Sequence, residues 1–139
     1  MIFKKKEETK IDKLFKELSK IINKKDELSA ARSIEILMTI SDGDQTYILE
    51  KIKKYSYKKN KFLDGLSAKL NRMKDKHFSI EVIQEVIDYC FRFGTTEIQE
   101  NGVLLLNTYF DQLKDRYKFL FVKNKKVQKM IDNMYRKEI

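Results

Sequence analysis

The chain of 139 residues contains no proline and only four glycines. Turns, hairpins and barrels depend on both residues, because proline fixes φ and glycine adopts φ values that other residues avoid. Helices joined by short polar turns need neither. The scarcity therefore argues against an all-β architecture and predicts an all-α fold. A chain of this length suits one domain, which can bury about two thirds of the surface that the unfolded chain exposes.

The chain has one cysteine, Cys90, and one histidine, His77. A lone cysteine forms no internal disulfide, which is typical of a reducing compartment. A metal site needs further His or Cys ligands at defined spacing, and no such spacing exists here. The glycines are isolated, so there is no glycine-rich phosphate loop. We therefore expect a non-enzymatic protein without a metal or organic cofactor.

Long hydrophobic runs are also absent. No segment approaches the about 20 consecutive apolar residues that span a membrane. The lysines near the N-terminus are not followed by the apolar run of a secretory signal. We expect one cytoplasmic domain over residues 1–139 that is not inserted into a membrane, with residues 1–8 forming a flexible basic N-terminus.

What the chain does have is apolar residues that recur at steps of three and four positions, the spacing of one helix face. The first stripe lies in residues 10–24, with Thr9 and Asp12 at the spacing of a capping box. The stripes predict a compact bundle or short solenoid of six to eight amphipathic helices. They lie in residues 10–24, 30–40, 48–55, 62–73, 79–93, 96–113, a segment from about 112 to 122, and 127–135.

Polar residues predict the helix ends. Gly43 can adopt the left-handed conformation that closes a helix, and Asp44 can cap the next one. Ser79 is expected to start the fifth helix and Gly94 to end it. Thr96 and Gln99 have capping-box spacing for the sixth. The segment Phe119-Leu120-Phe121-Val122 is expected to be the packed end of a helix rather than a lone strand, because a single strand has no partner here.

Residues 79–93 are apolar around most of the helix circumference, and residues 96–113 are apolar on a broad face. We expect these two helices to form a central hairpin that holds the core, with Cys90 buried in it. Glu81, Glu85 and Asp88 share one helix face, and we expect them to form an acidic stripe that faces solvent.

Charge is sorted along the chain. The net charge is +5 over residues 1–25, −5 over 26–50, +8 over 51–76, −5 over 77–113 and +6 over 114–139, which gives +9 in total. Sorted charge predicts basic ridges beside acidic ones, a surface that can discriminate between partners. The favoured hypothesis is a protein-protein interaction module, an adaptor or regulatory domain whose partner is another protein. The sequence leaves open whether the chain forms a homo-oligomer.

The alternative is a non-specific nucleic-acid-binding protein. Cations alternate with aromatics over residues 51–62, and phosphates attract cations while unstacked bases stack on aromatic rings. Only five of the 30 basic residues are arginines, however, and lysine reads bases less well. The candidate binding surface for either partner consists of Lys51, Lys53, Lys54, Tyr57, Lys58, Lys59, Lys61, Lys123, Lys125, Lys126 and Lys129.

Two stretches carry resemblances to known families. Residues 96–107, Thr-Glu-Ile-Gln-Glu-Asn-Gly-Val-Leu-Leu-Leu-Asn, resemble the second helix of armadillo and HEAT repeats, and residues 26–40 echo the same pattern. This resemblance implies a stack of two or three helix pairs whose concave face binds a protein or nucleic acid. Residues 38–43 and 108–111 are similar to pieces of poxviral Bcl-2-like proteins, which implies a small helical bundle that binds host proteins.

Overall fold

The computed structural model describes residues 9–58, 60–73 and 78–137, apart from the side chains at 57, 58 and 60. The expected flexible N-terminus and His77 lie outside these ranges. The described residues form eight helices and no strand, which confirms the all-α prediction. The helices are α1 (Lys10–Ile21), α2 (Glu27–Ser41), α3 (Gln45–Lys58), α4 (Asn60–Arg72), α5 (Ile80–Phe93), α6 (Thr96–Thr108), α7 (Phe110–Tyr117) and α8 (Lys125–Arg136).

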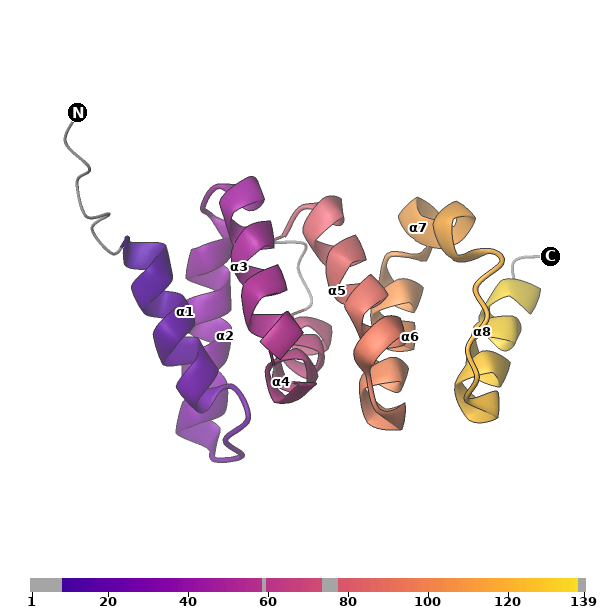
Figure 1. The fold of residues 1–139 in the computed structure, drawn as a ribbon, viewed down its shortest axis with the longest axis horizontal. Coiled ribbons are helices and arrows are strands. Elements are labelled where there is room, and N and C mark those ends of the chain that lie inside the picture. The colour runs from indigo at the N-terminus through magenta and orange to yellow at the C-terminus, as the bar shows by residue number, and fades with distance from the viewer. Residues whose placement is uncertain (1–8, 59, 74–77, 138–139) are drawn as a thin grey trace.

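The helices follow one another along the long axis of the molecule, with α1 at one end and α8 at the other (Figure 1). One layer contains α1, α3 and α5, in which α3 contacts both of the others. A second layer contains α2, α4, α6 and α8, each in contact with the next. Consecutive helices α1 and α2, α3 and α4, and α5 and α6 pack across the two layers. Segments far apart along this row therefore have little contact with each other.

Several predicted helix starts are confirmed. The hydroxyl of Thr9 accepts the backbone N–H of Asp12, and the Asp12 carboxylate accepts the N–H of Thr9, both at 3.1 Å, which completes the capping box of α1. Asp44 accepts the N–H of Thr46 at 2.9 Å at the start of α3. The hydroxyl of Ser79 accepts the N–H of Val82 at 3.3 Å and caps α5. Each cap satisfies an N–H that the helix leaves without a partner.

Two predicted helix boundaries, the end of α2 and the start of α6, are wrong in detail. No glycine among the described residues has a positive φ, so Gly43 does not close α2 in a left-handed conformation. It provides space instead, because a Cβ there would lie 2.6 Å from Cδ1 of Ile11 in α1. The cap of α6 is Thr95, whose hydroxyl accepts the N–H of Ile98. Thr96 lies one residue inside the helix, and its hydroxyl accepts from the side chain of Asn124 at 2.7 Å.

The prediction that residues 119–122 are the packed end of a helix is also wrong. Helix α7 ends at Tyr117, and residues 118–124 are irregular. The side-chain amide of Gln128 in α8 bonds this segment: its Oε1 accepts the N–H of Val122 at 2.7 Å, and its Nε2 donates to the carbonyl of Leu120 at 3.4 Å. These bonds replace helical ones, so the chain can run back and place α8 against α6.

The core is larger than the expected central hairpin. Ile87 of α5 and Leu105 of α6 are 0% and 1% exposed, as predicted, and Cys90 is buried between them and the other helices. The same cluster continues through α1 to α4, where Phe15 and Leu66 are buried. The apolar faces are narrower than expected, since Leu104 is half exposed. A second, small cluster holds α8 to the rest and consists of Val103, Val122, Val127 and Ile131.

Candidate functional site

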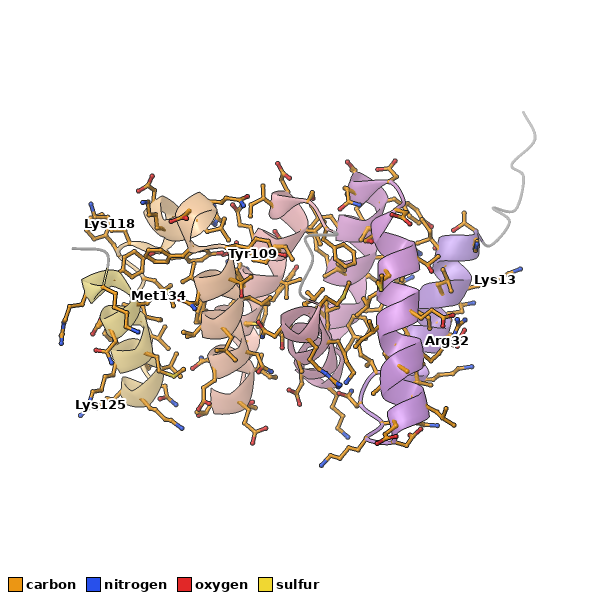
Figure 2. The ribbon with its side chains drawn as sticks, turned by 180° about the vertical axis from the view of Figure 1, so that it is seen from behind. Lys13, Arg32, Tyr109, Lys118, Lys125 and Met134 are labelled. Carbon is orange, nitrogen blue, oxygen red and sulfur yellow. The ribbon has the colours of Figure 1, made fainter. Side chains whose placement is uncertain are left out.

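The irregular segment 118–124 displays two phenylalanines. Phe119 is 89% exposed and Phe121 is 77% exposed, whereas Val122 between α7 and α8 is buried. The bonds from Gln128 hold the backbone at Leu120 and Val122, so this part of the segment has a defined path. Figure 2 shows that Lys118 and Lys125, which flank it, lie at opposite ends of α8. The segment therefore presents aromatic rings to solvent from an anchored backbone.

A groove of about 380 Å³ lies beside this segment, between α5 and α7. Phe91, Tyr117 and Leu120 supply its apolar part, and Phe121 forms one edge. The rings of Phe91 and Tyr117 are tilted against each other with centroids 6.2 Å apart. The charged side chains along it are Glu85, Asp88, Arg92 and Arg116. We call this hollow the α5–α7 groove.

Asp88 is the polar anchor of the groove. One carboxylate oxygen accepts from Arg116 at 2.6 Å, and the other accepts from the hydroxyl of Tyr117 at 2.5 Å. Burial is the main cause that raises the pKa of the Tyr117 phenol far above its usual value, and Asp88 adds to it. The hydrogen bond to Asp88 likewise raises the pKa of Arg116. Asp88 thus fastens α7 to α5 and is not a free carboxylate.

The other members of the expected acidic stripe differ from one another. Glu81 is exposed, as predicted, whereas Glu85 is partly buried with its carboxylate 3.9 Å from the ammonium of Lys53. The stripe is therefore partly neutralised by cations. Among the described residues, no cluster of His, Cys, Asp and Glu is arranged to hold a metal ion. Burial raises the pKa of the Cys90 thiol to about 12, which keeps it protonated and unreactive at neutral pH.

The first group of predicted site lysines lies on α3 and α4. Lys51 is not free, because its ammonium lies 2.8 Å from the Asp12 carboxylate and 5.4 Å from the centre of the Tyr47 ring. The hydrogen bond to Asp12 raises the pKa of Lys51. Lys53 is exposed and forms an ion pair with Glu85. Lys54 and Lys61 are exposed as well. The side chains of Tyr57, Lys58 and Lys59 lie outside the described part of the chain.

The second group lies around the start of α8. Lys123, Lys125, Lys126 and Lys129 are all exposed, and Lys126 lies 3.0 Å from the Glu100 carboxylate. Lys123, Lys125 and Lys129 line a hollow of about 260 Å³ together with Phe121. Helices α5 and α6 separate this group from the lysines of α3 and α4 (Figure 1). The structure therefore does not join the two predicted lysine groups into one surface.

Phe121 is the residue that the sequence interpretation missed. It lines both the α5–α7 groove and the lysine-lined hollow, and so stands between them. We call Phe119, Phe121, Lys123, Lys125 and Lys129 the C-terminal surface. No signal in the sequence marks it: the run Phe-Leu-Phe-Val is apolar at every position, and only the structure separates the exposed Phe119 and Phe121 from the buried Val122.

No helix in the described ranges has both the length and the apolar character that crossing a membrane requires. The chain was compared with protein-family models, with curated proteins and with solved structures, and none of them matches.

Proposed function

We propose that this protein is a non-enzymatic interaction module that binds a segment of another protein on its C-terminal surface. The partner segment combines apolar or aromatic side chains with acidic ones. The observation that carries the proposal is the 77% exposure of Phe121, which lines both the α5–α7 groove and a hollow lined by lysines.

The aromatic part of the argument rests on the exposure of the rings. Single exposed apolar residues are ordinary, but Phe119 and Phe121 are both largely exposed within three residues. Aromatic residues are enriched at the centres of protein interfaces, where burying a phenylalanine contributes about 1.5 to 3 kcal/mol. The anchored backbone also supports binding, since a segment held in place loses less conformational entropy when it binds a partner.

The charge of the surface supports an acidic partner. Lys123, Lys125 and Lys129 have no acidic residue within ion-pair distance among the described residues, and Asp132 is the one acidic side chain that lines the hollow. Three cations beside an apolar ring attract carboxylates and speed association at low salt. The three lysines also repel basic partners, so the surface favours apolar segments that carry acidic residues over those that carry basic ones.

A library of random peptides displayed on phage tests the proposal. We expect selection on the wild-type protein to enrich peptides that pair aromatic or aliphatic residues with Asp or Glu. The Phe121→Ala variant should bind the enriched peptides at least about tenfold more weakly, because the loss of about 1.4 kcal/mol corresponds to a factor of ten. The triple variant Lys123→Gln, Lys125→Gln, Lys129→Gln should bind more weakly and show less dependence on salt.

Leu28→Ala is the matched control, because Leu28 is 84% exposed on α2 at the other end of the molecule. It should bind the peptides as the wild type does. Peptides without acidic residues, or equal binding by the Phe121 and Leu28 variants, would show that the proposal is wrong.

Nucleic acid is the second candidate partner. Lys54 and Lys61 are exposed on α3 and α4, and the ring of Phe121 beside lysines is a combination that also suits single strands. Against this, Lys51, Lys53 and Lys126 are close to carboxylates of the protein itself. These pairs reduce the charge available to phosphates, so a protein partner is the better supported candidate.

We further propose a cytoplasmic location, supported by the unpaired, buried Cys90. The armadillo/HEAT resemblance also stays a proposal, which rests on the sequence of residues 96–107 and 26–40. The alternative, a resemblance to poxviral Bcl-2-like proteins, predicts a small helical bundle. Small-angle scattering separates these two, because a stack is longer than a bundle of equal mass.

A further inference from the structure

A second hollow, of about 340 Å³, lies between the connection from α1 to α2 and the helix α4. Four cations line it: Lys24 and Lys25 come from the connection, and Lys69 and Arg72 come from the last turn of α4. Asp64 is the one acidic side chain in the lining. We call this hollow the basic groove. It lies at the opposite end of the molecule from the C-terminal surface (Figure 1).

The backbone of α4 at Gly65 fixes the width of the basic groove. A Cβ at Gly65 would lie 2.7 Å from Oδ1 of Asn23 and 2.9 Å from the carbonyl oxygen of Ile22, so only glycine allows the connection to lie this close. Nδ2 of Asn23 donates to the carbonyl of Lys61 at 2.7 Å and ties the connection to α4. The side chain of Ile22 is buried below. Lys24 and Lys25 are thereby held beside Lys69 and Arg72.

Lys69 carries an uncompensated charge. It is partly buried, and no carboxylate lies within ion-pair distance of its ammonium in the part of the chain that the structure describes. Burial first, and then repulsion from Arg72, lower the pKa of Lys69, although Asp64 opposes both. Asp26, the cap of α2, follows Lys25 in the chain but does not line the groove. The hydrogen bond from the backbone N–H of Ser29 is the main cause that lowers its pKa, and the charge of Lys24 adds a smaller effect. The cations still outnumber the two acids.

A partly buried cation without a partner is unfavourable, because it loses hydration without gaining an ion pair. A bound anion would supply the missing interaction. Lysine ammoniums that approach from two sides suit a group with acceptor oxygens in several directions, and a phosphate has this shape, whereas a carboxylate has two oxygens in one plane. The volume lies at the lower end of the range of small-ligand pockets, about 300 to 1,000 Å³.

We propose that the basic groove is a binding site for a ligand with two adjacent phosphate groups, held by Lys24, Lys25, Lys69 and Arg72. The four cations and Asp64 give the lining a net charge of +3, which two phosphates balance better than one, because each phosphate carries about −1.5 to −2 at pH 7. Such groups occur on small soluble molecules and on phosphorylated lipid head groups, and both offer the same chemistry to this site.

Calorimetric titration with inorganic pyrophosphate in 150 mM salt tests the proposal. We expect the wild type to bind with a dissociation constant below 1 mM and to melt at a higher temperature in excess pyrophosphate, since a ligand that binds only the folded state stabilises it. Lys69→Gln should weaken binding at least tenfold, and Lys69→Arg should retain it. Lys13→Gln, on the exposed face of α1 (Figure 2), removes the same charge elsewhere and should bind as the wild type does.

The variant Lys24→Gln, Lys25→Gln changes only exposed side chains, so it should fold even if Lys69→Gln does not. It should also lose at least tenfold in affinity for pyrophosphate.

Vesicles that contain phosphatidylinositol bisphosphate form the second arm of the test. Binding to these vesicles as well as to pyrophosphate assigns the ligand to a lipid head group, and binding to pyrophosphate alone assigns it to a soluble molecule. No binding in either arm, or equal affinities for sulfate and pyrophosphate, or unchanged affinity in the Lys24/Lys25 variant, would overturn the proposal.

Discussion

The hydroxyl of Ser56 is buried in α3 and has no hydrogen-bond partner among the described residues. A buried polar group without a partner loses its bonds to water, at a cost of about 1 to 3 kcal/mol. We therefore predict that Ser56→Ala raises the free energy of unfolding by about 1 kcal/mol. Urea unfolding followed by circular dichroism measures the change.

Ser67 is the matched control for this prediction. It is equally buried in α4, but its hydroxyl donates to the carbonyl of Asp64 at 3.1 Å and accepts from Asn101 at 3.2 Å. Ser67→Ala should lower the free energy of unfolding, because it leaves Asn101 without this acceptor. If both variants are destabilised equally, the Ser56 hydroxyl makes a stabilising hydrogen bond, which would contradict the prediction.

A second prediction compares neighbouring leucines in α6. Leu105 is 1% exposed and Leu104 is 50% exposed. Leu105→Ala should lower the free energy of unfolding by about 2 to 5 kcal/mol, because it removes buried methylene groups and leaves a cavity. Leu104→Ala should change it by less than about 1 kcal/mol, as is usual for surface substitutions. Similar losses in the two urea curves would mean that α6 packs with a different face.

At the scale of elements, Asp12 joins α1 to α3. Its carboxylate accepts from Lys51 of α3 and from the hydroxyl of Tyr47, and it also completes the cap of α1. The bond to Lys51 first, and that to Tyr47 second, hold the pKa of the Asp12 carboxyl far below its usual value. Because the folded-state pKa is lowered, the stabilisation is fully present above pH 4 and is lost as the pH falls towards the folded-state pKa.

We predict that Asp12→Asn lowers the free energy of unfolding at pH 7 by about 1.5 to 3 kcal/mol, the range for hydrogen bonds to charged groups. The loss should shrink as the pH falls from 4 to 2, since the unfolded wild-type chain then binds a proton at Asp12 that the folded state does not, which lowers the stability of the wild type towards that of the variant. Urea curves at several pH values measure both effects. Glu50→Gln, on the exposed part of α3, is the control and should follow the wild type. A constant difference between Asp12→Asn and the wild type at all pH values would contradict this account.

The caps and buried faces of the helices could be predicted from the sequence where they depend on residues close together in the chain. The cap of α1 at Thr9 and Asp12, the start of α5 at Ser79 and the buried face of α6 all depend on residues a few positions apart. The prediction failed where the cause is distant. The path of residues 118–124 depends on Gln128 of the next helix, and Lys51 is engaged by Asp12 on another helix. Period and composition carry no information about such bonds.

At the scale of the whole molecule, the candidate surfaces differ in whether their residues are close together in the chain. The lysines of residues 51–61 formed a candidate site because they are close in the chain. The basic groove escaped notice because Lys24 and Lys25 are far in sequence from Lys69 and Arg72, and they come together through the contact at Gly65 and the hydrogen bond from Asn23 to α4. The C-terminal surface was half predicted: its lysines were named, and Phe121 was placed in a helix.

The sorted charge leads to a prediction about nucleic acids. Because carboxylates of the protein neutralise several lysines, and α5 and α6 separate the two lysine groups, we expect a dissociation constant no tighter than about 10 μM for DNA or RNA at 150 mM salt, in the range of non-specific binding. Fluorescence anisotropy with single- and double-stranded oligonucleotides across a salt series measures it. A submicromolar constant that is lost in Lys53→Glu, Lys54→Glu, Lys58→Glu, Lys59→Glu, with helicity retained, would favour nucleic acid as the main partner.

The small cluster that holds α8 has a consequence for folding cooperativity. Val103, Val122, Val127 and Ile131 form this cluster, and α8 packs chiefly on α6. In a row of helices, each unit is stabilised by its neighbours, so the end unit can open alone. We predict that amide hydrogens of α8 exchange faster than those of α5 and α6, as mass spectrometry would show. A partner held at Phe121 and Lys125 would slow this exchange, because a ligand that binds the closed state of α8 stabilises it against opening.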